Sequence, residues 1–551
     1  MSPYRAGHGN EPRAEGEQDG LVNELIQQFA DPLAFYRELI QNSIDAEATQ
    51  VAVTVTFEHD GGAEGDALGR LEVSVRDDGC GMSRAVLEEQ LTVLFRSGKE
   101  DQTDKIGKFG VGFVSVLAVE PALVSVRTTE GAGEQWTLEL GADQTYELFR
   151  AEGGGGSGTT VTLRLERVES EFRAFVKGSE RALVKWCRHA EIPIRFVASF
   201  LGDELIRETR IDTPLGVDAL VSVRVEDSGT TVVAGLPADG SSYLGFFNRG
   251  LLLHETSQGV LGRVVVSVQD GRLEHTLSRD NVRRDEHHAR AMSMASRVID
   301  RELTREVHDV LRELAGGAVS DVSIEAVLTA ARNAGLTLDE GAIQIPLIEA
   351  SRGQRTVRLR DLRKGEVYFA SEADELTAAV AERGAAIVDL SRARYLAAYV
   401  QVLEAYASRT IDSVHTQFTL AAPIEASGAD LVLMDQVGEL IGALVRQPNG
   451  PTLARFSGAR ASALQLAGGD GELPLALDAE MASANPFRML MRPAWLFNAE
   501  HPSVLAARRL AVTEPAIAAT LLTRVLLSER GRLGPDEDEA WLEAASEAVA
   551  R

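Results

Sequence analysis

The sequence has little of three features that would each point to a particular class of protein. It carries two cysteines, Cys80 and Cys187, which are too few for a disulfide scaffold and lack the CxxC spacing of a metal site. It has no run of about 18 apolar residues that would span a membrane, and the stretch 1–20 lacks the apolar core of a signal peptide. We therefore expect a cytoplasmic protein without a membrane partner.

Positive charge is also scarce in this chain. Lysine and arginine number 56 against 83 aspartate and glutamate residues, for a formal net charge of −27. Such a chain repels phosphate backbones, and no concentrated basic patch stands out to offset the repulsion. The composition predicts no nucleic-acid partner and weighs against a DNA-handling enzyme.

The length of 551 residues predicts three or four domains, and 44% hydrophobic with 25% charged residues is typical of a globular chain. Residues 1–18 are polar and rich in glycine, which favours a disordered tail. We place domain boundaries near residues 175 and 410. The run GGGGSG (153–158) is either a linker or a loop, and the strand pattern that follows it favours a loop inside the first domain.

Hydrophobic periodicity predicts the elements of each part. A helical pattern covers about 21–46, and alternation at period two predicts strands at 51–57, 71–77, 122–129 and 159–166. Such strands form a sheet with one buried face, so we expect an α+β domain with helices on one side of a mostly antiparallel sheet. Further strands are expected at 193–201 and 263–271, with a long helical segment from Glu286 to Leu314. The acidic segment 536–551 predicts a solvated helix face.

A polar stripe appears when FYRELIQNSIDA (35–46) is read as a helix. Glu38, Asn42 and Asp45 then stand at i, i+4 and i+7, on one narrow face. Three polar residues at this spacing usually form a solvated surface. The alternative is that they point into a site.

Two glycine motifs follow the stripe. In DDGCGM (77–82) the glycines allow a tight turn and the close approach of a flat ligand, and Asp77 at a strand end can accept from an amino group. Otherwise it is an ordinary surface turn. In IGKFGVGFVSVL (106–117) three glycines precede an apolar helical pattern, an arrangement that binds phosphate or serves as a hinge. It matches neither the GxxxxGK[ST] nor the GxGxxG pattern.

The order of these signatures resembles the GHKL ATPases. RELIQNSIDA, DDGCGM, SGKE and IGKFGVGF are most similar to the heat-shock protein 90 family. The segments FNRGLLL (247–253), HTLSRDNV (275–282) and LFNAEHPSVLAARRL (496–510) are similar to later parts of that family. The resemblance implies a Bergerat-type two-layer α/β sandwich for ATP at 19–175, an α/β middle domain at 176–410 and a mixed α/β dimerisation domain at 411–551.

The resemblance also implies roles for the stripe and for the first glycine motif. Glu38 would orient or deprotonate the attacking water, Asn42 would supply an oxygen to Mg²⁺, and Asp45 would help build the ATP pocket. The adenine side of the pocket would be formed by Asp77, Gly81, Met82 and Thr159.

For the phosphates, the resemblance implies backbone N–H groups from the second glycine motif, with Ser97, Gly98 and Lys99 at the entrance of a lid over the site. Arg279 would act as an arginine finger toward the γ-phosphate, which requires the first two domains to dock. The remaining ATP-binding residues would be Ser97, Gly98, Lys99, Gly107, Gly110, Val111, Gly112 and Phe113.

The function implied is that of an ATP-dependent molecular chaperone, with ATP and Mg²⁺ as cofactors and unfolded or client proteins as partners. It would act in protein folding and the stress response as a homodimer joined through its C-terminal domain. Two alternatives stay open at this point: an ATPase of DNA repair or topology, and a nucleotide-gated regulatory or defence protein. A sensor histidine kinase is disfavoured because no phosphoacceptor helix precedes the ATPase motifs.

Overall fold

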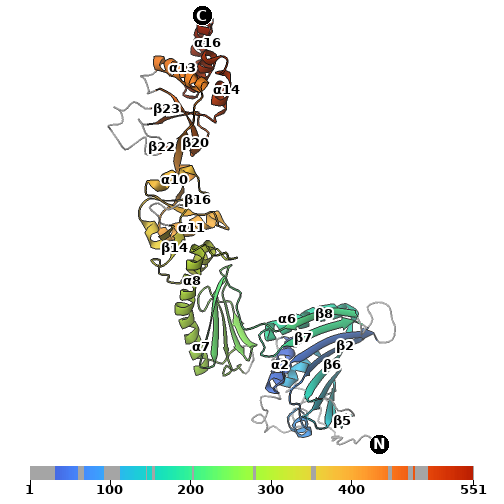
Figure 1. Ribbon diagram of the computed structural model, residues 1–551. Coiled ribbons are helices and arrows are strands. Elements are labelled where there is room, and N and C mark those ends of the chain that lie inside the picture. The colour runs from blue at the N-terminus through green and yellow to red at the C-terminus, as the bar shows by residue number, and fades with distance from the viewer. Residues whose placement is uncertain are drawn as a thin grey trace. The chain divides into compact units, whose positions relative to one another are not determined.

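The computed structural model describes residues 31–59, 68–91, 112–143, 145–151, 156–200, 204–276, 281–348, 355–444, 450–468, 476–477 and 494–549. The chain divides into two compact units: Met1–Glu306 with Ala330–Leu336, and Val307–Thr329 with Thr337–Arg551. The helices and strands of both units are mapped on the ribbon in Figure 1. The mixture of helices and sheets confirms the α+β class.

The first unit begins with an eight-stranded sheet in the order β5-β4-β3-β6-β2-β1-β7-β8. Neighbouring strands are antiparallel except β1 and β7, which run parallel. A mostly antiparallel sheet was expected, and the pairings confirm it. The strands are β1 (Val51–His59), β2 (Leu68–Asp77), β3 (Leu123–Thr129), β4 (Gln135–Gly141), β5 (Tyr146–Arg150), β6 (Gly158–Val168), β7 (Ile194–Phe200) and β8 (Glu204–Ile211).

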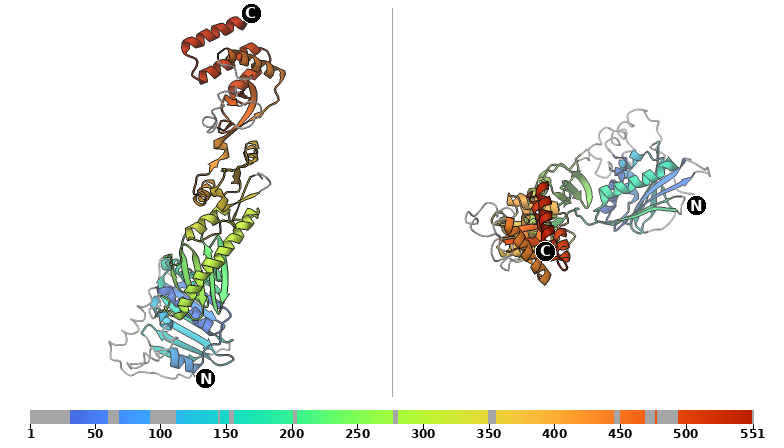
Figure 2. Two further views of the ribbon diagram at one scale, coloured as in Figure 1. Left: turned by 90° about the vertical axis from the view of Figure 1, so that its left-hand side faces the viewer. Right: turned by 90° about the horizontal axis from the view of Figure 1, so that it is seen from above.

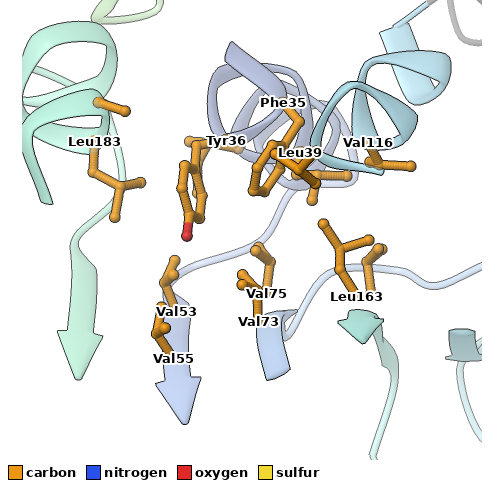
Figure 3. Packing of buried hydrophobic residues seen from close by; sticks show 14 of the residues in the cluster. Phe35, Tyr36, Leu39, Val53, Val55, Val73, Val75, Val116, Leu163 and Leu183 are labelled. Atoms are coloured by element: carbon orange, nitrogen blue, oxygen red, sulfur yellow. The ribbon is translucent and has the colours of Figure 1, made fainter. Parts of the chain in front are cut away.

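One face of this sheet is buried and the other is not, as the alternating sequence predicts. In β1 and β2 the buried positions alternate with partly exposed ones, and the buried side chains are mainly valine, leucine and phenylalanine. Figure 3 shows Val53 and Val55 of β1, with Val73 and Val75 of β2, pointing toward the helix above them. Because β-branched side chains pack well on a pleated surface, these segments favour strands.

Helices cover that buried face. They are η1 (Pro32–Ala34), α2 (Phe35–Asp45), η4 (Ser115–Val119) and α6 (Glu169–Cys187), with α3 (Arg84–Val86) and η2 (Leu87–Leu91) after β2. Helix α6 contacts α2, β1, β2 and β6, and Figure 2 shows it lying across the strands. Phe35, Tyr36 and Leu39 of α2 belong to the same core (Figure 3). The layer of helices on one side is therefore confirmed.

The boundary predicted near residue 175 is wrong, because it falls inside α6. Helix α6 is the crossover that returns the chain to the sheet, where β7 pairs in parallel with β1 and β8 follows β7. The alternation of 193–201 predicts a strand but does not tell which sheet it joins. The loop interpretation of the glycine run is confirmed, since the flanking strands β5 and β6 belong to one sheet.

A second sheet of five strands, in the order β12-β11-β13-β10-β9, completes the first unit. Helix α7 and the π-helical turn η5 pack on it. The helical segment expected from Glu286 to Leu314 is confirmed as α7, η5 and α8 in succession. The elements are β9 (Val221–Asp227), β10 (Thr230–Leu236), β11 (Tyr243–Asn248), β12 (Leu251–Thr256), β13 (Val265–Asp270), α7 (Glu286–Arg297) and η5 (Val298–Leu303). The next two helices, α8 (Thr304–Ala315) and α9 (Ile324–Ala334), each have residues in both units.

The second unit contains three sheets and several helices. A boundary was predicted near residue 410; just past that position β18 pairs with β16 in a three-stranded sheet. The elements are β14 (Gln344–Pro346), β15 (Thr356–Arg358), η7 (Leu359–Arg363), β16 (Val367–Ala370), α10 (Glu375–Glu382), β17 (Ala386–Asp389), α11 (Leu396–Ala407), β18 (Asp412–Ser413), α12 (Val414–Gln417), β19 (Phe418–Pro423), α13 (Gly428–Leu444), β20 (Thr452–Gly458), β21 (Gln465–Gly468), β22 (Ala476–Leu477), β23 (Ala494–Asn498), α14 (Pro502–Leu510), α15 (Pro515–Glu529) and α16 (Pro535–Val549).

Helix α16 confirms the acidic helix expected at the end of the chain, with Asp536 and Glu537 exposed in its first turn. Carboxylates there are favourable because they face the positive end of the helix dipole. Among the described residues, none of the helices is both long enough and apolar enough to cross a bilayer. The tail expected at 1–18 lies outside the described residues.

Candidate functional site

Helix α2 carries the polar stripe from the core to the surface. Asp31 accepts from the N–H of Leu33 at 2.9 Å and so caps η1, which runs directly into α2. Along the stripe Glu38 is buried at 8% exposure, Asn42 is half-buried and Asp45 is exposed. The stripe is therefore not a solvated face.

The glycine turn after β2 lies against the end of α2. Gly81 has a φ of 74°, and a Cβ built there would lie 1.9 Å from the carbonyl oxygen of Thr129, so only glycine fits. The N–H of Cys80 donates to the carbonyl of Ala46 at 2.9 Å, and that of Met82 donates to the hydroxyl of Thr128 at 2.8 Å. These contacts fix the turn between α2 and β3.

Asp77, at the end of β2, is half-buried and has a specific set of donors. Its Oδ1 accepts from the N–H of Gly79 at 3.0 Å and from the N–H of Thr159 at 3.1 Å. Its Oδ2 accepts from the hydroxyl of Ser43 at 3.1 Å. Burial raises the pKa of Asp77 above its usual range, and the charge of Asp78 adds to the rise, while the three donors oppose it. The carboxylate is thus oriented but poorly solvated.

These elements enclose a cavity of about 360 Å³, within the size range of small-molecule sites. Its polar groups come from α2 and from the ends of β2 and β6, and its walls are mainly aliphatic. The lining residues are Leu39, Asn42, Ser43, Asp45, Ala46, Val75, Asp77, Cys80, Gly81, Met82, Val86, Leu91, Phe113, Val126, Thr159 and Val161. A flat, mainly apolar ring with one amino group pointing to Asp77 fits this lining.

Glu38 lies one helical turn before Asn42, and it is not among the residues that line the cavity. Its Oε1 accepts from Nη2 of Arg37 at 2.9 Å and from Nε of Arg37 at 3.2 Å. Arg37 is 4% exposed, and its guanidinium lies 4.9 Å from the centre of the Trp186 ring. The carboxylate is therefore held as half of a buried ion pair.

Comparison with known proteins shows what the region around this cavity is similar to. Residues 36–147 match the family described as histidine kinase-, DNA gyrase B-, and HSP90-like ATPase. Chaperone protein HtpG of Anaplasma marginale is 29% identical over 197 residues, which are 33% of this chain and 29% of that protein. The endoplasmin homolog of Leishmania donovani is 29% identical over 191 residues, 28% of this chain and 23% of that protein.

The chain is therefore similar, over part of its length, to ATPases and chaperones of the heat-shock protein 90 type. HtpG of Mycobacterium ulcerans is a further relative, 29% identical over 167 residues, 28% of this chain and 24% of that protein. The aligned region spans less than a third of these relatives. The family match at residues 36–147 includes every lining residue of the cavity except Thr159 and Val161.

The structure brings together seven of the predicted residues on this cavity. Gly112 is buried beside them and begins the helical turn that leads into η4, where the hydroxyl of Ser115 donates to its carbonyl at 2.6 Å. The seven are Asn42, Asp45, Asp77, Gly81, Met82, Phe113 and Thr159. Outside the described residues lie Ser97, Gly98, Lys99, Gly107, Gly110, Val111 and Arg279.

Two polar residues of the site were missed from the sequence. Ser43 donates to Asp77, and Thr128 accepts from Met82 and lies 3.0 Å from the hydroxyl of Thr159. The sequence does carry a signal for Thr128, because Thr128 and Thr129 are consecutive polar residues in an alternating strand; in the structure both are buried. Ser43 offers none, because a serine in a helix is ordinarily exposed or bonded to its own backbone.

Proposed function

We propose that the protein is an ATPase that binds ATP in this cavity and works as a molecular chaperone. The supporting observation is that seven residues predicted for ATP line one cavity of about 360 Å³. Residues far apart in the sequence meet there by way of the strand order of the first sheet. An interpretation of these motifs as separate surface turns would not explain that convergence.

Asp77 would select adenine. Both of its oxygens already accept from the protein, and Oδ2, which has one donor, retains capacity for the adenine amino group. Guanine presents an acceptor at the corresponding position, which would leave the carboxylate facing an oxygen. A buried polar group that loses its partner costs about 1–3 kcal/mol, more when charged, so discrimination of about 10²-fold or more is expected.

Glu38 would orient or deprotonate the attacking water, and Arg37 would position it by the ion pair described above. Arg279 would contribute positive charge at the γ-phosphate, where an arginine finger can raise the rate by about 10³–10⁵. Phosphate contacts would come from the second glycine motif, of which Gly112 and Phe113 are described and buried. Ser97, Gly98 and Lys99 would border the entrance.

Asn42 would hold Mg²⁺. Its amide lies on the cavity beside Asp45, which suits a cation that takes few protein ligands and many phosphate and water oxygens. In the described part of the chain, no three His, Cys, Asp or Glu side chains form a group suited to a metal, and a site of this type does not need one. The metal would neutralise phosphate charge when bound.

Replacing Glu38 by alanine tests the hydrolysis. The full chain should hydrolyse ATP with Mg²⁺, and Glu38→Ala should keep nucleotide binding while losing about 10²–10⁴ in turnover, the usual contribution of a positioned acid or base. Glu166→Ala is the matched control, because Glu166 is exposed on β6 and does not line the cavity. Equal turnover by wild type and Glu38→Ala would rule out the role of Glu38.

The chaperone part of the proposal requires clients and a dimer. Five large apolar side chains of the C-terminal segment are exposed at 40% or more, which suits contact with another chain: Leu431, Val432, Val512, Leu521 and Leu542. We expect a cytoplasmic homodimer through this segment. Unfolded protein should stimulate the ATPase, and the chain should suppress its aggregation. Stimulation by DNA alone would instead favour the DNA-repair alternative.

A further inference from the structure

The turn between β11 and β12 of the five-stranded sheet has an unusual backbone. It consists of two residues, Arg249 and Gly250, with φ angles of 50° and 78°. Two positive φ values are typical of the type I′ hairpin turn, where asparagine and glycine are preferred and arginine is uncommon. A Cβ built on Gly250 would lie 1.7 Å from the carbonyl oxygen of His189, so the turn packs directly on the chain after α6. A strained residue kept at such a position suggests a role for its side chain.

The backbone of this turn is fixed from both sides. Nδ2 of Asn248 donates to the carbonyl of Leu273 at 2.8 Å and to that of Gly271 at 3.2 Å, which ties the turn to the end of β13. The N–H of Glu191 donates to the carbonyl of Arg249 at 3.3 Å, which ties it to the segment between α6 and β7. The backbone that bears the Arg249 side chain is therefore held in place by hydrogen bonds on both sides of the turn.

The guanidinium of Arg249 joins two carboxylates. Its Nη1 donates to Oδ1 of Asp45 at 3.0 Å, and its Nε donates to Oε2 of Glu191 at 3.2 Å. Asp45 is the last residue of α2 and lines the cavity, whereas Glu191 does not line it. Arg249, from the turn between two strands of the second sheet, thus contacts the last residue of the polar stripe on α2.

This contact supplies a charge that α2 lacks. The helix has no basic residue in its last turn and ends with a carboxylate, at the end where the helix dipole is negative. An acidic side chain in that position is unfavourable, and a cation beside it is favourable. Arg249 provides the cation from a distant part of the sequence, so the end of α2 depends on the β11–β12 turn.

The end of α2 in turn supports the turn that bears Asp77. The carbonyl of Ala46, next to Asp45, accepts from the N–H of Cys80 at 2.9 Å. A Cβ on Gly79 would lie 2.7 Å from the same carbonyl oxygen, which shows how closely the two segments pack. Displacing the end of α2 would therefore displace the adenine acceptor.

We propose that Arg249 is a positioning residue that couples the five-stranded sheet to the nucleotide cavity through Asp45. The coupling rests on the proposed nucleotide function. Because linkage is reciprocal, Arg249 strengthens nucleotide binding and bound nucleotide stabilises the β11–β12 turn to the same degree.

Arg249→Asn tests the coupling, because asparagine tolerates a positive φ and removes the guanidinium with its contacts to Asp45 and Glu191. In the full chain we expect the Kd for ADP to rise about 5-fold, near the low end of typical couplings because the pair is partly exposed. Arg249→Lys should restore affinity to within about 2-fold of wild type, since it keeps the charge. Arg195→Asn is the matched control: its pair with Glu208 is exposed and neither residue lines the cavity, so the Kd of this variant for ADP should not change.

Amide hydrogen exchange of residues 243–256 distinguishes coupling from a purely structural role, because only coupling makes the exchange rate at this turn depend on bound ADP. ADP should slow exchange at the β11–β12 turn in wild type and not in Arg249→Asn, while both proteins melt at similar temperatures without nucleotide. If wild type binds no nucleotide, the proposed function fails. If wild type binds ADP but Arg249→Asn binds equally well and its turn responds equally, the coupling fails and the proposed function stands.

Discussion

Two neighbouring carboxylates at the end of β2 face different regions of the molecule. Asp77 turns toward the cavity, where it is half-buried. Asp78 is exposed and turns toward the loop after α2, where its Oδ1 accepts from the N–H of Thr49 at 2.7 Å and from that of Gln50 at 3.1 Å. Residue type and sequence position therefore do not distinguish a carboxylate that faces a ligand site from one that only holds the backbone. The donors around each carboxylate do.

The largest expected effect of this difference is on nucleotide affinity. Asp77→Asn replaces an acceptor by an amide group whose N–H₂ would face the adenine amino group. A hydrogen bond to a charged group contributes about 1.5–3 kcal/mol, so the Kd for ADP should rise about 10- to 150-fold. Asp78→Asn should change it less than about 3-fold, because a surface group typically alters energies by within about 0.5 kcal/mol. Titration calorimetry measures the Kd for ADP of both variants. Equal losses of affinity would contradict the different roles of Asp77 and Asp78.

A smaller loss of nucleotide affinity is expected when Ser43 is replaced, because Ser43 donates to Asp77 and not to Asp78. Its hydroxyl lies 3.1 Å from Oδ2 of Asp77 and 3.0 Å from the carbonyl of Leu39. Ser43→Ala removes one neutral donor, worth about 0.5–1.5 kcal/mol, so the Kd should rise about 2- to 12-fold. Ser74→Ala on β2 is the control, because Ser74 does not line the cavity. A loss as large as that of Asp77→Asn would mean that Ser43 itself binds the base.

The smallest expected effect is a pair of opposite pH trends in stability. Burial raises the pKa of Asp77, so its contribution to stability is present below the ordinary aspartate pKa and is lost as pH rises through the raised value. Although partial burial opposes it, the donors Thr49 and Gln50 lower the pKa of Asp78. The Asp78 contribution is therefore present above the ordinary pKa and is lost as pH falls through the lowered value.

Urea unfolding of wild type, Asp77→Asn and Asp78→Asn across the acidic range measures these trends. Relative to wild type, the unfolding free energy of Asp77→Asn should improve as pH rises, and that of Asp78→Asn should worsen. Trends of the same sign for both variants would contradict the two environments.

The sequence allows much of this arrangement to be predicted. Alternation locates the strands, and the spacing of Glu38, Asn42 and Asp45 shows one face of a helix. The choice of Asp77 over Asp78 came from the family resemblance, since both precede the same glycine turn. The placement of β7 beside β1 could not be predicted, because a parallel pairing through α6 joins segments whose local patterns say nothing about the partner strand.

The two ion pairs of the site could not be predicted from the sequence either. Arg37 is adjacent to Glu38 in sequence, but adjacent residues on a helix ordinarily point in different directions. Their pairing depends on burial beside Trp186, and the contact of Arg249 with Asp45 depends on a turn far along the chain. Such contacts are set by tertiary packing, which periodicity does not encode. The roles of Glu38 and Arg279 stay predictions.

Calorimetric titration of the full chain with ATP and with GTP, in the presence of Mg²⁺, tests the central claim most directly. We predict saturable binding of ATP and binding of GTP weaker by about 10²-fold or more, because Asp77 meets an amino group in adenine and an oxygen in guanine. Equal affinity for the two nucleotides, or no binding of ATP, would contradict an adenine-specific site at Asp77.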